Sequence, residues 1–285
     1  MKIVDFRVRT PYGKYLESGF FADIPFREKV ADGKYNMTLP KSVYQNSMEL
    51  LIEEMDKENI VKAVVPGRKA FGISNEDLVD LLEKYSGRFI GFAGVDGHDG
   101  KEALNEIKKY VIDGPLTGVV IEPGYGDDPM AVGDDRIEPI YAYCEKYDIP
   151  MIVGFGGMLH PSLDLMDPKD VDRIALRHPN LRMLLSHGGW PFVQEVIWIA
   201  LMRKNVYIMP DLYMYQTPFT VEYVAAANTV IKDKIIYGSA YPIVSQKESV
   251  NNYLNCGIHG EFLENVMFNN ALKFLGVTEE ELKEM

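Results

Sequence analysis

The chain has 285 residues, 47% of them hydrophobic and 25% charged, so it is long enough to bury one large core. Its formal net charge of -12, with no basic run to offset it, argues against nucleic acid as a partner, because phosphate backbones would be repelled. The two distant cysteines, Cys144 and Cys256, exclude a disulfide framework and fit a reducing compartment. No apolar run approaches the roughly 20 residues of a membrane span, and strand-like residues begin directly after Met1. We therefore expect no membrane partner and a cytoplasmic location.

Short apolar runs alternate with helical patterns along the whole chain. The runs typical of strands are residues 2–9, 60–65, 89–94, 117–122, 150–154, 182–187, 205–210 and 234–238. Ser74 and the Asp167-Pro168 pair are placed to begin two of the intervening helices. Eight strands in regular alternation with helices predict an α/β fold, a closed (β/α)8 TIM barrel, forming a single domain over residues 1–285. An open dinucleotide-binding sheet is disfavoured, because no Gly-x-Gly-x-x-Gly opens the first helix.

Residues 11–45 interrupt this rhythm between the first strand and its helix. The segment is rich in aromatic residues: Tyr12, Tyr15, Phe20, Phe21, Phe26, Tyr35 and Tyr44. A long connection after a barrel strand rises from the mouth where active sites lie, which predicts a lid or binding loop. The alternative, that it covers exposed apolar surface, is equally supported.

Several short motifs, in order along the chain, carry a family resemblance. They are Val4–Arg9, Ile149–Gly154, Leu184–Trp190, Ile235–Pro242 and the Asn269-Asn270-Ala271 triplet. Together they resemble the first, fifth, sixth and eighth strands and the closing helix of the amidohydrolase superfamily, in its amidohydrolase-2 group of aminocarboxymuconate semialdehyde and resorcylate-type decarboxylases. The resemblance covers nearly the whole chain and implies the same barrel.

The resemblance fails at the metal ligands. In the family, a histidine pair on the first strand, a fifth-strand histidine and an eighth-strand aspartate hold a divalent ion, with a sixth-strand histidine beside it. The matching positions here are Arg7, Arg9, Gly154 and Ala240, and only His187 remains. A guanidinium offers donors only, so we expect no metal at this position and no cofactor. A different ion held by His187, Asp211 and Glu122 is the alternative, opposed by the arginine charges.

Strand alternation places Asp5, Arg7 and Arg9 on one face of the first strand, which we expect to face the barrel interior. The apolar set, Val4, Phe6 and Val8, should then pack under the helices. Arg68, at the end of the second strand, would join the two arginines at the mouth. Three guanidinium groups predict a site for a small carboxylated molecule, since each can grip a carboxylate through a planar fork. The alternative is that they neutralise Asp5, Glu122 and Asp211.

His187, at the end of the sixth strand, is the candidate acid and base, because its pKa suits proton transfer at cellular pH. Asp211 and Glu122, also at strand ends, are the candidates to orient it or act as bases. Further candidates for the substrate-binding site are Tyr213, Tyr241 and Trp190, the tyrosines either as oxyanion donors or as pocket walls. His98 and His160 are weaker candidates on the same face, and His178 and His259 are expected at the surface.

These residues predict a metal-independent enzyme that hydrolyses a lactone-type or related C–O or C–N bond in a small carboxylated substrate. Two alternatives stay open. One is a decarboxylase or other lyase, by analogy with the family. The other is a ligand-binding pseudoenzyme, for which Gly154 and Ala240 fit a decayed site whereas Arg7 and Arg9 do not. The chain could also form a homo-oligomer.

Overall fold

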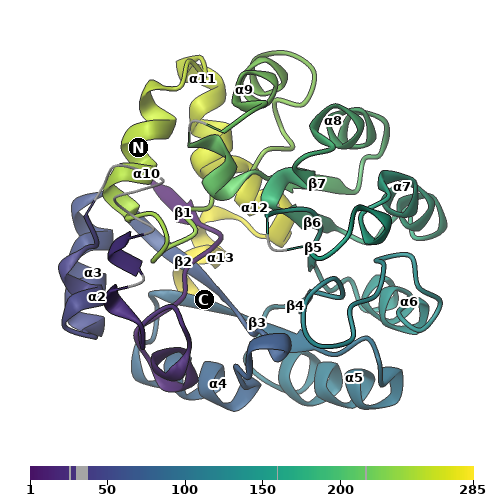
Figure 1. Ribbon diagram of the computed structural model, residues 1–285, viewed down its shortest axis with the longest axis horizontal. Coiled ribbons are helices and arrows are strands. Elements are labelled where there is room, and N and C mark those ends of the chain that lie inside the picture. Colours follow the sequence, from purple (N-terminus) through teal and green to yellow (C-terminus); the bar gives the residue numbers. More distant parts are fainter. Residues whose placement is uncertain (26, 30–37, 159, 216) are drawn as a thin grey trace.

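The computed structural model describes residues 1–25, 27–29, 38–158, 160–215 and 217–285. Within these ranges, seven parallel strands pair in sequence order and curl around a common axis (Figure 1). They are β1 (Ile3–Asp5), β2 (Ile60–Pro66), β3 (Phe89–Val95), β4 (Gly118–Ile121), β5 (Met151–Gly154), β6 (Met183–Ser186) and β7 (Val206–Met209). The chain has the expected (β/α)8 architecture, with an irregular eighth position.

The predicted eighth strand, residues 234–238, closes the barrel without forming a regular strand. Ile208 of β7 donates its N–H to the Lys234 carbonyl and accepts from the N–H of Ile236, both at 2.9 Å. On the other side, the N–H of Phe6 donates to the Tyr237 carbonyl at 3.0 Å. The segment therefore joins β7 to β1, which is the ring closure of a barrel.

The first strand is shorter than predicted, and its side chains point to the opposite faces from those predicted. β1 ends at Asp5, whose Oδ1 accepts the backbone N–H of Arg7 at 3.1 Å, a local bond that turns the chain. Asp5 lies outside the barrel, where it accepts from the N–H of Ser239 at 2.8 Å. Val4 and Phe6 instead fill the barrel interior, and the Phe6 ring lies 5.6 Å from that of Phe274. The expected interior position of Asp5 and exterior positions of Val4 and Phe6 are therefore wrong.

A ring of helices surrounds the strands: α3 (Met48–Lys57), α4 (Asn75–Lys84), α5 (Gly100–Ile107), α6 (Glu138–Lys146), α7 (Pro168–Arg177), α8 (Val193–Met202), α9 (Thr220–Asn228), α10 (Gln246–Asn255) and α11 (Gly260–Glu264). Two predicted helix starts are confirmed. The Ser74 side chain caps α4 by accepting from Asp77 N–H, and Asp167 caps α7 by accepting from Lys169 N–H.

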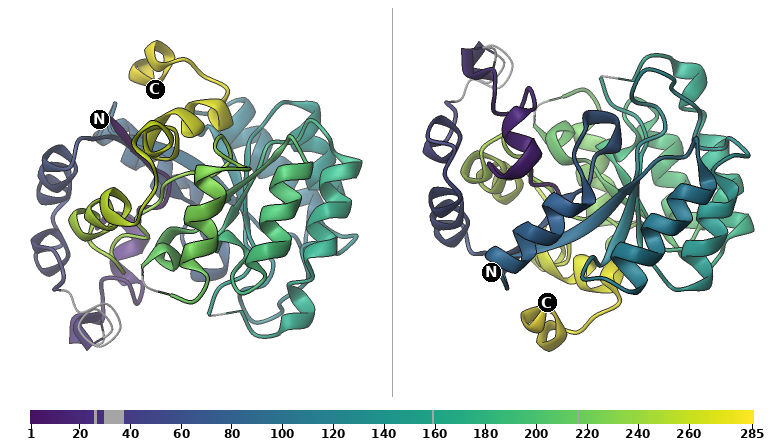
Figure 2. Two further views of the ribbon diagram at one scale, coloured as in Figure 1. Left: turned by 90° about the horizontal axis from the view of Figure 1, so that it is seen from above. Right: turned by 90° about the horizontal axis from the view of Figure 1, so that it is seen from below.

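The end of the barrel that holds both termini is closed by α12 (Asn270–Leu275) and α13 (Glu279–Glu284) (Figure 2). Lys2 and Glu279 form an ion pair across this end. The Phe274 ring of α12 stacks on Phe92 of β3 at 6.4 Å, so this helix plugs the interior. The opposite end, at the carboxyl ends of the strands, is the mouth, and functional residues of such barrels lie there. No helix among the described residues is long and apolar enough to cross a membrane.

Within residues 11–45, the structure describes η1 (Gly13–Glu17) and α2 (Lys41–Tyr44), whereas Phe26 and Tyr35 lie outside the described residues. The Tyr15 hydroxyl donates to the Pro66 carbonyl at the end of β2, at 2.6 Å. The Phe20 ring lies 4.6 Å from the Arg9 guanidinium carbon. The segment therefore packs against the mouth of the barrel.

Candidate active site

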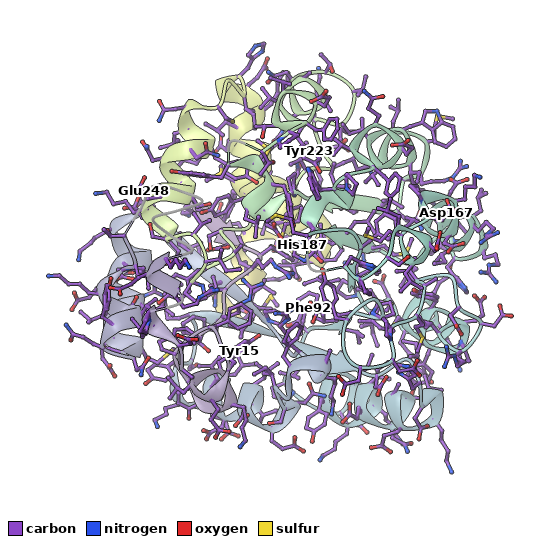
Figure 3. The ribbon with its side chains drawn as sticks, viewed as in Figure 1. Tyr15, Phe92, Asp167, His187, Tyr223 and Glu248 are labelled. Carbon is purple, nitrogen blue, oxygen red and sulfur yellow. The ribbon has the colours of Figure 1, made fainter. Side chains whose placement is uncertain are left out.

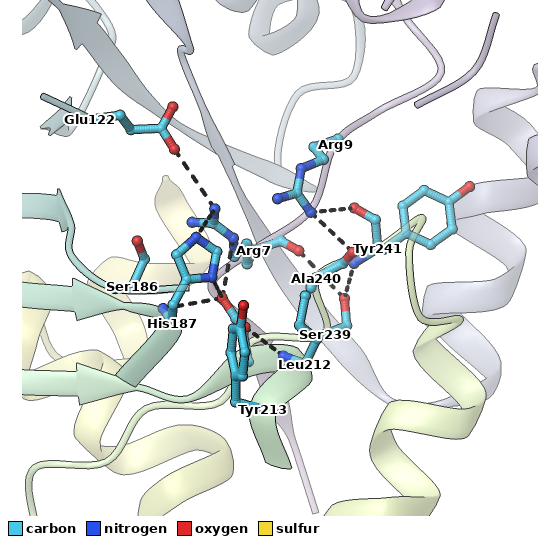
Figure 4. A network of polar contacts seen from close by, with 12 residues as sticks. Arg7, Arg9, Glu122, Ser186, His187, Leu212, Tyr213, Ser239, Ala240 and Tyr241 are labelled. Atoms are coloured by element: carbon cyan, nitrogen blue, oxygen red, sulfur yellow. Dashed lines mark hydrogen bonds and ion pairs between the residues drawn. The ribbon is translucent and has the colours of Figure 1, made fainter. Parts of the chain in front are cut away.

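Arg7 lies at the centre of a buried polar network at the mouth (Figure 4). Its Nη2 is 3.2 Å from His187 Nε2 and 3.7 Å from Glu122 Oε1, and its Nε is 3.3 Å from Asp211 Oδ2. The histidine lies near the middle of the ring of strands in Figure 3. One guanidinium thus stands between the three side chains that were the alternative metal ligands.

The residues present do not fit a divalent ion. Within the described ranges, no three histidine, cysteine or acidic side chains are grouped to hold one. A Cβ added to Gly154 would lie 3.1 Å from the Glu122 Cα, so Glu122 fills the space beside the fifth strand. Ala240 offers only its carbonyl, which accepts from Arg9 Nη1 at 3.0 Å. The fixed positive charge of Arg7 would also repel a cation placed among these groups.

The contact with Arg7 decides the tautomer of His187. A guanidinium can only donate, so Nε2 is the acceptor and the ring proton lies on Nδ1. Nδ1 faces Asp211 Oδ2 at 3.1 Å. Burial lowers the pKa of His187, and Arg7 acts in the same direction while Asp211 opposes both. The histidine is therefore a neutral imidazole held in one orientation.

Two backbone N–H groups of other residues hold the Asp211 carboxylate in place. It has a positive φ of 45°, and its carboxylate accepts the N–H groups of Leu212 at 2.6 Å and His187 at 3.3 Å. Burial would raise the pKa of this carboxyl, but His187 and Arg7 outweigh burial and hold the pKa below its usual value. Asp211 is therefore ionised, as an orienting carboxylate must be.

Glu122 and Arg68 bind each other. Arg68 Nε and Nη2 donate to the two carboxylate oxygens at 2.8 and 2.9 Å, a bidentate pair. Burial opposes ionisation of Glu122, but Arg68 and then Arg7 hold its pKa below the usual value. Arg68 was a candidate for substrate binding, and Glu122 was a candidate base or orienting group. In the structure, the two side chains bind mainly to each other. This is the alternative role considered for Arg68, neutralising a carboxylate within the protein.

Arg9 is buried and differs from the other two arginines. Its Nη1 donates to the carbonyls of Ala240 and Tyr241, at 3.0 and 3.3 Å, and none of the described carboxylates forms an ion pair with it. Burial, followed by the charges of Arg7 and Arg68, lowers its pKa well below the usual value. A guanidinium still keeps its proton at neutral pH. The cluster of Arg7, Arg9, Arg68, Glu122 and Asp211, with His187 neutral, has a net charge of about +1.

Of the three aromatic candidates, Tyr213 and Trp190 lie beside His187, whereas the Tyr241 hydroxyl points elsewhere. The Tyr213 ring meets His187 edge-on at 5.7 Å and stacks on Trp190 at 5.2 Å, and its hydroxyl accepts the Met158 N–H at 2.6 Å. Tyr213 and Trp190 therefore form one wall beside His187. Tyr241 turns its hydroxyl away from the arginines, to Ser42 Oγ at 2.6 Å, so it offers Arg9 only a carbonyl (Figure 4).

Of the remaining histidines, His160 and His98 lie near the mouth, whereas His178 and His259 lie elsewhere. His160 lies 5.7 Å from Tyr125, whose ring is 6.3 Å from His187, so Tyr125 connects the two. His98 binds Asp96 beside a cavity of about 450 Å³ that Tyr125 also lines. The expected surface position of His178 is wrong, because this residue is buried between two glutamates.

His178 contacts Glu138 at 2.9 Å and Glu145 at 3.0 Å, so two residues of α6 hold it. His259 is exposed as expected. Sequence reasoning did not select Tyr125 or Phe20 for the site. The only signals were the aromatic content of residues 11–45 and the position of Tyr125 just after Glu122 and a Pro-Gly pair.

Comparison with known proteins decides the family. A model of the amidohydrolase family matches residues 38–277, most of the chain. The chain belongs to the amidohydrolase family. A solved structure of an uncharacterized TIM-barrel protein from Bordetella bronchiseptica is 32% identical, with a TM-score of 0.91 over 97% of this chain and 99% of that one.

More distant structures share the amidohydrolase fold. A 2,6-dihydroxybenzoate decarboxylase from Rhizobium is 17% identical, with a TM-score of 0.66 over 97% of this chain and 99% of its own. A 5-carboxyvanillate decarboxylase from Sphingomonas paucimobilis is 14% identical, with a TM-score of 0.67 over the same shares. No curated protein matches the chain. The amidohydrolase family and these two decarboxylases are enzymes.

Proposed function

We propose that the protein is a metal-independent amidohydrolase-like enzyme that hydrolyses a lactone-type or related C–O or C–N bond in a small carboxylated substrate. One observation carries the proposal. A neutral His187, oriented by Asp211 at 3.1 Å, lies in a buried cationic cluster where Arg9 has no carboxylate partner among the described residues. This arrangement joins a general base to an anion-binding group.

The substrate carboxylate would bind Arg9. A buried guanidinium whose hydrogen bonds to the described residues go to carbonyls gains more from a carboxylate than one already paired, such as Arg68. Tyr213 and Trp190 would then contact the body of the substrate from the wall beside His187.

His187 would activate water through Nε2. The contact of this atom with Arg7 is 3.2 Å long, so a substrate oxygen can draw the Arg7 N–H away while Nε2 takes a proton from water. The water oxygen then bonds to the carbonyl carbon, and Arg7 stabilises the oxyanion. As the C–O or C–N bond breaks, the imidazolium returns its proton to the leaving atom. Asp211 stabilises the imidazolium throughout.

Decarboxylation is the second candidate, because structurally similar proteins are decarboxylases of 2,6-dihydroxybenzoate and 5-carboxyvanillate. Loss of CO2 needs an electron sink next to a carboxylate that is not strongly stabilised. Arg9 would stabilise the carboxylate itself, in the ground state, which slows that reaction. This argument places hydrolysis first.

Turnover of a panel of lactones and unsaturated or aromatic carboxylic acids by chelator-treated protein tests the proposal. Mass spectrometry separates a gain of water from a loss of CO2. His187→Asn should reduce turnover by about 10²–10⁴-fold, as losses of general acid–base groups do. The matched control is His259→Asn, at an exposed position, which should keep full activity. Loss of CO2 would establish the lyase instead, and carboxylate binding without turnover of any compound would indicate a binding protein.

A further inference from the structure

Helix α8 exposes an apolar outer face. Trp198, Leu201 and Met202, spaced three and four residues apart, lie on one side of the helix and are 50%, 48% and 52% exposed. The inner side is also apolar, with Val196 and Ile199 buried. Outer helices of a barrel normally present polar side chains to water, and an exposed apolar face on such a helix is normally covered by a partner. We therefore expect the outer face of α8 to be covered by a binding partner.

The neighbouring helix α7 extends this face and forms a groove with α8. Leu176 of α7 is 58% exposed. The groove holds about 400 Å³ and is lined by Pro168, Lys169, Asp172, Gln194, Glu195, Trp198 and Ile199. A half-exposed tryptophan at the edge of a groove is typical of the residues that dominate interface energies. In Figure 1 both helices lie on the side of the barrel opposite α3 and α10.

The charges of this face restrict the partner. Three cations are already neutralised within the chain, in the pairs Arg173–Asp170, Arg177–Glu138 and Arg203–Asp172. Two groove residues of opposite sign remain, Lys169 on α7 and Glu195 on α8, and neither forms an ion pair with any described residue. A strongly acidic or basic partner would gain little from a face with no net charge. A second copy of the same face would match it.

We propose that the α7–α8 face is a two-fold interface between two copies of this chain. A two-fold axis through the groove brings Lys169 of each copy opposite Glu195 of the other. The interface then contains two symmetric Lys169–Glu195 ion pairs. The same operation brings the two Trp198 side chains together over the groove, where each covers apolar surface of the other copy. The overall charge of -12 would oppose association elsewhere on the surface, which leaves this neutral face as the contact.

The mass in solution tests the interface. Light scattering after gel filtration, at about 10–100 μM protein, should give twice the mass of one chain. Trp198→Asp should raise the dissociation constant at least about thirtyfold and give the single-chain mass. The variant should still unfold in one cooperative transition, whose midpoint no longer depends on protein concentration. Leu254→Asp is the matched control, since Leu254 is also 50% exposed but lies on α10. A single-chain mass for the unmodified protein, or a Trp198→Asp variant with the unmodified mass, would overturn the proposal.

Charge exchange tests the two-fold pairing. Lys169→Glu and Glu195→Lys each place like charges opposite one another, so each should weaken the dimer. The double variant exchanges both charges and should restore the double mass, because each new pair is again of opposite sign. If the double variant remained weaker than both single variants, the two-fold arrangement would be wrong. None of these positions lies at the mouth, so the test does not depend on the proposed reaction.

Discussion

Arg7 Nη2 lies 3.2 Å from His187 Nε2, and both side chains also contact Asp211. This contact links the lost metal site to the remaining histidine. A permanently charged guanidinium takes the central position among the acidic and imidazole groups of the mouth. It balances their charge as a cation, but it offers donors instead of open coordination positions. The chemistry that remains available is proton transfer and electrostatic stabilisation.

The purified protein should contain far less than one divalent ion per chain, because Arg7 occupies the space between the remaining candidate ligands. Elemental analysis measures the content directly. A chelator should leave the melting temperature unchanged, since no metal contributes to the stability of the fold. About one zinc or manganese per chain, with stability lost to the chelator, would contradict this prediction.

Arg9→Met should weaken the binding of a small carboxylate, such as benzoate, by on the order of 2–5 kcal/mol, because a buried charge contact with the ligand is lost. The fold should survive, since the variant removes a buried charge with no carboxylate partner among the described residues. Calorimetry of ligand binding and a melting curve measure the two effects. Arg136→Met, at an exposed arginine paired with Asp134, is the control. Unchanged affinity together with a destabilised fold would make Arg9 structural.

Arg68→Met should destabilise the protein by about 3–5 kcal/mol, because it strips Glu122 of its bidentate partner at a buried position. Adding Glu122→Gln should recover part of this loss, since the carboxylate charge is then removed as well. Urea unfolding of the two single variants and the double variant gives the coupling free energy. Additive effects would show that the pair is not coupled.

Acid should destabilise the unmodified protein more than a His187→Asn variant. The pKa of His187 is lowered in the fold, so between that lowered value and the ordinary value near 6.5 the unfolded chain binds a proton that the folded chain does not. Stability therefore falls as the pH drops through this window, by up to about 1.4 kcal/mol per pH unit. The difference between the two unfolding curves, at pH 7.5 and at about pH 5.5, isolates this group. Equal pH dependence would mean that His187 titrates normally in the fold.

Asp211 and Glu122 add a second acid-sensitive range. Their pKa values are lowered in the fold, so their stabilisation is present above the ordinary carboxyl range and is lost as the pH falls below about 4. Asp211→Asn should remove part of this loss. It should also lower the pKa of His187 further, because Asp211, more than Glu122, opposes the effect of burial there. An NMR titration of the histidine would measure the shift, and a rise in its pKa would contradict the assigned contact.

The sequence by itself determined the architecture and showed that other residues stand at the family's metal-ligand positions. Alternating strand and helix patterns gave the barrel, and Ser74 and Asp167 marked helix starts correctly, because caps and periodicity depend on neighbours within a few residues. The substitution of Arg7 and Arg9 for metal ligands could also be seen directly in the first strand. These features are local, so no distant contact was needed to recognise them.

Only the tertiary structure decided which charges bind each other. Arg68 pairs with Glu122, 54 residues away, and Arg7 with His187, 180 residues away, whereas Arg9 is left with carbonyl partners. Alternation holds over Val4, Asp5 and Phe6 in the opposite phase to the one expected. It fails at Arg7, because the chain turns where the Arg7 N–H donates to the Asp5 carboxylate. Buried ion pairs depend on which strand ends meet at the mouth and on bends of a few residues, and neither is encoded in the spacing of residue types along the chain.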